Sequence, residues 1–177
     1  MKEVDRLVDV VKKLRAPSGC PWDQEQTLDS VKSGLIEESY EVVDAIEGKD
    51  YSALCEELGD VLLQVVFQSQ ICSEEKHFSL EDVAQVVTEK LIRRHPHVFS
   101  DRKVSGTEEV LRNWDAIKKK EKTERTSILE GIPKHLPALQ KAWQVQKRVA
   151  RVGFEWDEIE DVIRSFVKRF RSLKRRC

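Results

Sequence analysis

Two pairs of acidic residues have the types and the spacing in this sequence that could do chemistry. The first pair is Glu38 and Glu41, and the second is Glu57 and Asp60. The members of each pair are three positions apart, so on a helix both carboxylates project from one side about one turn apart. Carboxylates held close together raise one another's pKa unless a cation lies among them. A divalent metal ion with oxygen ligands is the counterion that such a cluster favours.

The four carboxylates can meet only if two neighbouring helices run antiparallel. Apolar periodicity predicts one helix from Thr27, an expected N-cap, to Gly48, and a second helix over about 51–72 that is apolar on most sides. A turn around Gly48 would bring the two pairs together. Because the second helix is expected in the centre of a bundle, Glu57 and Asp60 need a cation or a basic partner. Single acidic pairs are usually solvated, but two pairs on adjacent amphipathic helices favour a metal site.

The rest of the sequence predicts an all-α protein. Seven glycines and five prolines among 177 residues, with 36% charged residues, favour long helices over a sheet with many turns. Further helices are expected over about 2–15, 80–94, 106–122 and 137–151, and from 157 towards the end. Gly131, Pro133 and Pro137 indicate a linker. We therefore expect a catalytic helical domain over residues 1–125, and a linker with a C-terminal helical extension over residues 126–177.

Basic residues downstream of the acidic pairs could bind phosphates. Lys90, Arg93 and Arg94 fall within one turn of an amphipathic helix, and Arg offers phosphate oxygens a fork while Lys offers a point charge. The competing interpretation is a charged helix end that the helix dipole favours. Trp114 and Lys118 are four positions apart, so a base could stack on the indole while the ammonium reaches a phosphate. A core position for this tryptophan is the alternative.

The end of the sequence is basic. From Arg164 to Cys177 there are seven basic residues and no acidic one. We favour a solvated helix end over nucleic-acid binding, because a single short run is weak evidence for such a partner. No segment approaches the length needed to span a bilayer, and the first residues lack the apolar stretch of a signal peptide. We therefore expect a cytoplasmic protein with no membrane or nucleic-acid partner.

The acidic pairs are part of a longer pattern that resembles a known family. Glu37-Glu38-x-x-Glu41 followed by Glu57-x-x-Asp60 resembles the EExxE and ExxD signature of the all-α nucleoside triphosphate pyrophosphohydrolases, and the chain resembles the MazG family in particular. The resemblance covers residues 1 to about 157. It extends to Gly19-Cys-Pro-Trp22-Asp-x-x-Gln26-Thr27, Lys90-Leu-Ile-Arg93-Arg94-His95-Pro-His97-Val-Phe99, Trp114-x-x-Ile-Lys118 and Val152-Gly-Phe-Glu-Trp156.

The resemblance implies a homodimeric helical bundle that uses Mg²⁺, with Mn²⁺ as a substitute, to hydrolyse NTPs and dNTPs. Water would attack the α-phosphorus, releasing the nucleoside monophosphate and pyrophosphate, in a house-cleaning role for nucleotide pools. Carried over by position, the metal ligands would be Glu38, Glu41, Glu57 and Asp60. The phosphates would be held by Lys90, Arg93, Arg94 and Lys118, the nucleotide would contact Trp114, and the attacking water would be positioned or activated by Glu37 and Glu38.

One departure from the family pattern leaves an alternative open. A two-domain relative would begin a second acidic domain after Gly153-Phe-Glu-Trp156, whereas this sequence has only the short acidic stretch 157–161 there and becomes basic from Arg164. If catalysis depends partly on that second domain, activity would be weak. The alternative function is a noncatalytic helical module that binds nucleotide or nucleic acid without turnover.

Overall fold

The computed structural model describes residues 2–121, 127–156 and 158–174, and it confirms the all-α prediction: no strand occurs in the described part of the chain. The chain divides into two compact units, residues 1–111 and 112–177, with the division inside one helix. The predicted domain boundary at residue 125 lies outside the described residues.

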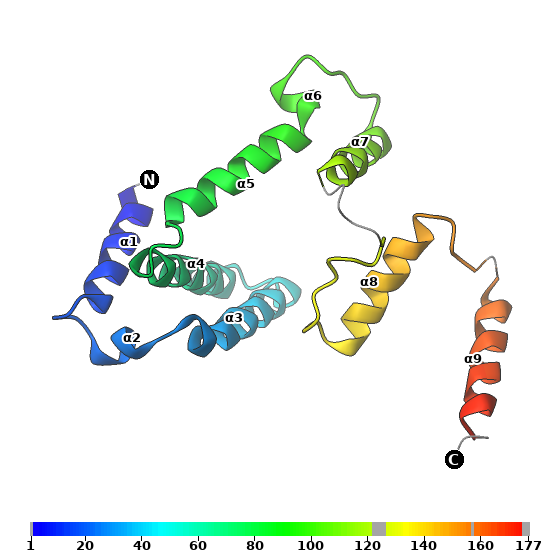
Figure 1. Ribbon diagram of the computed structural model, residues 1–177, viewed down its shortest axis with the longest axis horizontal. Helices are drawn as coiled ribbons and strands as arrows, with labels where there is room; N and C mark the ends of the chain where they lie inside the picture. Colours follow the sequence, from blue (N-terminus) through cyan, green and yellow to red (C-terminus); the bar gives the residue numbers. More distant parts are fainter. Residues whose placement is uncertain (1, 122–126, 157, 175–177) are drawn as a thin grey trace. The chain divides into compact units, whose positions relative to one another are not determined.

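The first unit is built around a helical hairpin. Its helices are α1 (Lys2–Arg15), α2 (Pro21–Glu25), α3 (Leu28–Gly48), α4 (Tyr51–Glu74), α5 (Leu80–Arg94) and α6 (Pro96–Phe99), followed by the start of α7 (Thr107–Lys120). In Figure 1, α3 and α4 run side by side in opposite directions, and α1 and α5 contact α4. The predicted turn after Gly48 is confirmed, so this hairpin carries both acidic pairs.

The ends of the hairpin helices are fixed by local capping. The Thr27 side chain accepts a hydrogen bond from the Ser30 backbone, and the Ser30 side chain accepts one from the Thr27 backbone, which forms a capping box at the start of α3. The helix ends through Lys49, whose φ of 54° is left-handed. Asp50 then accepts hydrogen bonds from the backbones of Ser52 and Ala53 and caps α4. The chain therefore reverses within two residues.

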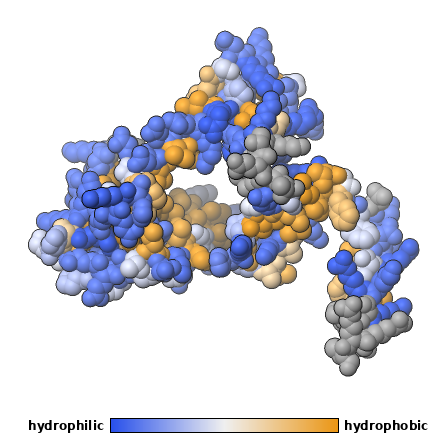
Figure 2. Space-filling view, viewed as in Figure 1, coloured by the Kyte–Doolittle hydropathy of each residue, from blue (hydrophilic) through white to orange (hydrophobic). Residues whose placement is uncertain are grey.

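The core of the first unit lies at one end of the hairpin. Val11 of α1 is buried against Val66, Phe67 and Ile71 of α4, so the C-terminal half of α4 is central, as predicted. The N-terminal half is not: Leu58 is 51% and Leu62 38% exposed. The prediction that this helix lies in the centre of a bundle thus holds for only half its length in the first unit, and Figure 2 shows apolar residues at the surface.

Arg15, the last residue of α1, contacts both the segment before α3 and the end of α4. The Arg15 guanidinium donates hydrogen bonds to both carboxylate oxygens of Glu74 at the end of α4, at 2.8–3.1 Å. It also donates to the carbonyl oxygens of Asp23 and Gln26 and lies 5.2 Å from the centre of the Phe67 ring. This one side chain, only 7% exposed, holds the start of α3 and the end of α4 together.

The second unit contains the rest of α7 together with α8 (Ala138–Ala150) and α9 (Ile159–Lys174). Arg148 of α8 donates to the carbonyl oxygens of Ile128, Glu130 and Gly131, which fixes the preceding turn on this helix. Arg151 pairs with Asp115 of α7 at 3.2 Å. Among the described residues, no helix combines the length and the hydrophobicity needed to cross a lipid bilayer.

Candidate metal centre

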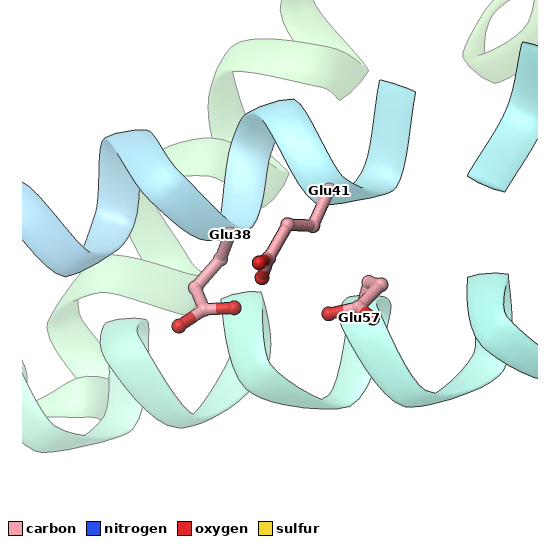
Figure 3. A group of neighbouring side chains, drawn as sticks. All are labelled: Glu38, Glu41 and Glu57. Atoms are coloured by element: carbon pink, nitrogen blue, oxygen red, sulfur yellow. The ribbon is translucent and has the colours of Figure 1, made fainter. Parts of the chain in front are cut away.

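Three carboxylates from the two hairpin helices converge. Glu38 and Glu41 project from α3 and Glu57 from α4, and each provides an oxygen within 4.8 Å of the others. Figure 3 shows the three side chains pointing toward one another across the space between the helices. Three of the four carboxylates that were predicted to meet therefore do so, because the tight turn sets the antiparallel register.

The convergence disturbs the ionisation of the cluster. Partial desolvation, and then the hydrogen bond and negative charge of Glu41, raise the pKa of Glu38 above the ordinary glutamate range, with further contributions from Asp60 and Glu57. The pKa of Glu57 is also raised, by desolvation and then mainly by the charge of Glu41. The ionised cluster is thus unfavourable on its own and is stabilised by a cation.

Asp60 lies beside this cluster. Its charge raises the pKa of both Glu38 and Glu57, but it does not belong to the group of oxygens within 4.8 Å. The structure therefore brings three of the four predicted ligands into a common metal-sized space and keeps the fourth close enough to act on their charge. Carboxylate oxygens are the donors that Mg²⁺ and Mn²⁺ prefer, so this donor set fits such an ion.

Four other predicted site residues of the first unit do not belong to this group. Glu37 is exposed on α3, next to Glu38 but outside the cluster. Lys90, Arg93 and Arg94 occupy the last turns of α5, which continues away from the hairpin in Figure 1. The placement of these three cations toward a phosphate therefore stays a prediction.

Trp114 and Lys118 are in α7 within the second compact unit. Both are half-buried, and both make interactions within the structure. The proposed contact of the indole with a nucleotide, and of the ammonium with a phosphate, stays a prediction.

One polar residue near the cluster was not predicted from the sequence. Gln64 follows Asp60 by four positions on α4, and its amide lies against Gly34 of α3. Extending the spacing of the acidic pair by one helical turn would have led to this residue. A search confined to charged side chains passes over it.

Comparison with known proteins agrees with this geometry. Residues 26–99 match the model of the MazG nucleotide pyrophosphohydrolase domain, a range that contains α3, α4, α5 and all four predicted metal ligands. The chain is also similar to a mazG-related protein from Thermotoga maritima of known crystal structure, with a TM-score of 0.56 and 29% identity. That alignment covers 65% of this chain and 98% of the other.

Two curated relatives extend the similarity along nearly the whole chain. The nucleoside triphosphate pyrophosphohydrolase of Escherichia coli K12 is 45% identical over 92% of this chain. The nucleoside triphosphate pyrophosphohydrolase/pyrophosphatase MazG of Thermotoga maritima is 44% identical over 96% of this chain. The chain spans 63% and 66% of the lengths of these two relatives.

Proposed function

The chain belongs to the MazG family, and we propose that it hydrolyses nucleoside triphosphates to the monophosphate and pyrophosphate. The observation that carries the proposal is the convergence of Glu38, Glu41 and Glu57 from two helices. The fold alone would not support it, because helical bundles host many functions. The names of the relatives supply the reaction class.

The metal in this proposal is Mg²⁺, with Mn²⁺ as a substitute. Glu38, Glu41 and Glu57 would hold it, with Asp60 as the fourth carboxylate. When bound, such an ion would lower the pKa of a water molecule and neutralise charge on the leaving group. The raised pKa values of Glu38 and Glu57 support the assignment, because desolvation and neighbouring carboxylates cause them and no basic side chain of the described residues is among the causes.

The chain's own residues would bind and orient the substrate. Lys90, Arg93, Arg94 and Lys118 would neutralise phosphate oxygens, Trp114 would contact the nucleotide, and Glu37 and Glu38 would position the attacking water. An oxygen–phosphorus bond then forms at the α-phosphorus while the bond to the oxygen bridging the α- and β-phosphorus breaks. Pyrophosphate leaves with the electron pair of the broken bond. This chemistry requires no covalent protein intermediate.

We further propose that the enzyme acts as a homodimer in the cytoplasm, where it removes aberrant nucleotides from the NTP and dNTP pools. The N-terminal half of α4 exposes large apolar side chains, including Tyr51, Leu58 and Leu62. These side chains support the proposal, because a second copy of the chain could pack on them. Leu58 and Leu62 precede the buried Val66 by eight and four positions on this helix, so their exposure would be costly in an isolated chain.

The test is product analysis with purified protein, Mg²⁺ and a panel of NTPs and dNTPs. Monophosphate plus pyrophosphate is expected, with activity reduced at least about a hundredfold in Glu38→Gln and Glu57→Gln. Glu47→Gln is the matched control, because Glu47 is an exposed carboxylate of the same helix that lies outside the cluster. Diphosphate plus phosphate would place the cleavage elsewhere, and nucleotide binding without turnover would favour the noncatalytic module.

A further inference from the structure

Gly34 is a glycine inside a long helix. It lies in the second turn of α3, where glycine is less favourable than alanine because it loses more conformational freedom on folding. A β-carbon at this position would lie 2.6 Å from Nε2 and 3.3 Å from Cδ of Gln64. The three nearest atoms all belong to the amide end of that one side chain. The missing β-carbon therefore provides the space in which this amide sits.

Gly59 provides a contrast within the same hairpin. It is also inside a helix, α4, but no atom lies within 4 Å of where its β-carbon would be. The open space at Gly59 therefore does not indicate that a particular side chain needs a glycine there. At Gly34 the space is filled by a specific polar group.

Gln64 and Gly34 are each one helical turn from the carboxylate cluster, Gln64 on α4 and Gly34 on α3. Gln64 follows Asp60 by four positions on α4, and Gly34 precedes Glu38 by four positions on α3. Because the two helices are antiparallel, these offsets run in the same direction along the hairpin. Along α4, the Gln64 amide is thus the first polar side chain after Asp60 in the direction away from the turn.

The amide has hydrogen-bonding capacity to spare. Gln64 is half-buried, and within the described residues its side chain takes part in no hydrogen bond. One turn further along α4, Nε2 of Gln68 is buried and also lacks a hydrogen-bond partner in the described part of the chain. Buried polar groups without partners are unfavourable and uncommon in folded proteins. A helical glycine and unpartnered amides at one place therefore point to a ligand that uses them.

We propose that Gln64, seated against Gly34, binds a sugar hydroxyl of the nucleotide whose phosphates lie at the carboxylate cluster. The inference rests on the proposed function, since that function places the phosphates. An amide both donates and accepts hydrogen bonds, as a hydroxyl does. The stripe from Gln64 to Gln68 carries no cation, so it suits the neutral sugar better than the charged β- and γ-phosphates.

Two ligands separate a sugar contact from a contact with the β- and γ-phosphates or with the metal that they bind. A nucleoside monophosphate contains the sugar, whereas pyrophosphate does not. Binding of each in the presence of Mg²⁺ is measured by calorimetry, which needs no turnover. We compare wild type with Gln64→Met, which keeps an unbranched side chain of similar length but removes the amide. Gly34→Ala keeps the amide but displaces it, and Gly59→Ala is the control for adding a methyl group to a helical glycine of this hairpin.

In Gln64→Met and Gly34→Ala, affinity for the monophosphate is expected to fall about tenfold, while affinity for pyrophosphate stays within about twofold of wild type. The loss should be equal for purine and pyrimidine monophosphates, because the sugar is shared. Gly59→Ala should bind both ligands like wild type. The melting temperature of Gly34→Ala should be unchanged or higher, because alanine favours the helix and the end of the Gln64 side chain can move.

Equal losses for pyrophosphate and monophosphate would overturn the sugar contact and place the amide at the phosphates or metal. A loss confined to one base, or no loss in either variant, would overturn it as well. The proposed function fails separately: a wild-type protein that binds monophosphate through Gln64 but hydrolyses no triphosphate would retain this inference and reject the activity.

Discussion

At the scale of single residues, the site is an arrangement of like charges. Glu38, Glu41 and Glu57 offer oxygens within 4.8 Å of one another, and the pKa values of Glu38 and Glu57 are raised by desolvation and by neighbouring carboxylates. The folded protein therefore binds protons more tightly at these groups than the unfolded chain does. Between the ordinary glutamate pKa and the raised values, stability falls as pH rises.

Because the carboxylates repel one another when no metal is bound, removing one charge should have opposite effects with and without metal. Glu41→Gln removes a charge that acts on both neighbours, so the metal-free variant should melt at a higher temperature than wild type at pH 7. The same variant should bind Mg²⁺ more than about tenfold more weakly, because a coordinating oxygen loses its charge. Differential scanning calorimetry from pH 4.5 to 8, with EDTA and with Mg²⁺, measures both effects.

Glu47→Gln again serves as the control, since its carboxylate lies outside the cluster. A Glu41→Gln protein that melts lower than wild type in EDTA would contradict the repulsion argument. A variant that retains the full Mg²⁺-induced rise in melting temperature would show that the ion binds elsewhere.

At the scale of helices, the position of the cluster depends on contacts that lie far from it. Arg15 bonds both oxygens of Glu74 and two backbone carbonyls, which joins the start of α3 to the end of α4. Because α3 and α4 are antiparallel, this contact closes the hairpin at the end opposite the turn. The register that brings Glu38 near Glu57 is thus held from both ends.

Removing the Glu74 charge should weaken this closure in a pH-dependent way. Hydrogen bonds from Arg15 and Gln70 hold the pKa of Glu74 below the ordinary range, with Arg15 the larger cause. The stability from this pair is therefore present above the ordinary glutamate pKa and is lost as pH falls through the lowered value. Glu74→Gln should cost about 1 kcal/mol at pH 7, allowing for the partial exposure of the carboxylate.

Urea unfolding at pH 7 and pH 3 measures this difference. The difference between the wild type and the variant should be largest at pH 7 and smaller at pH 3, because the Glu74 carboxylate takes up a proton as pH falls through its lowered pKa. An unchanged difference at the two pH values would assign the effect to packing rather than to charge.

In the turn between the hairpin helices, Lys49 has a backbone conformation that is unfavourable for a residue with a side chain. Lys49 has a φ of 54°, a left-handed geometry that favours glycine. Lys49→Gly should therefore stabilise the protein by about 0.5–1 kcal/mol. Asp50→Ala, which removes the α4 cap, should destabilise it by about 1 kcal/mol. Chemical denaturation of both variants measures the pair, and a destabilising Lys49→Gly would show that the lysine side chain contributes a contact that outweighs the strain.

Two short helices, α2 and α6, were not predicted from the sequence for the same reason. The expected helices over 2–15 and 80–94 stop before the prolines at 21 and 96, but each proline occupies the first turn of a short helix, α2 and α6. Proline is tolerated there because its missing N–H would have no helical partner. Long helices were predictable because their apolar faces repeat over several turns, whereas one turn carries no such repeat. The carboxylate cluster was predictable from spacing, but the direction of α5, and hence of Lys90, is set by packing.

At the scale of the whole molecule, the first unit has more apolar surface than its core can cover. Few described side chains are fully buried, while Leu58, Leu62 and Tyr51 of α4 are exposed at 51%, 38% and 79%. These three continue a helix whose other half is central to the core. A second copy that packs on this half of α4 would complete the bundle, and in a two-fold interface each residue is used twice.

The dimer prediction can be tested with a single exposed leucine. Leu58→Glu should sediment as a monomer at micromolar concentration, because burying a leucine stabilises by about 1.5–3 kcal/mol and a symmetric interface loses two. Leu139→Glu is the control: Leu139 is 86% exposed but belongs to α8 of the other unit. Sedimentation of wild type as a monomer, with a melting temperature independent of concentration, would contradict the dimer, because an interface that completes a core couples folding to association.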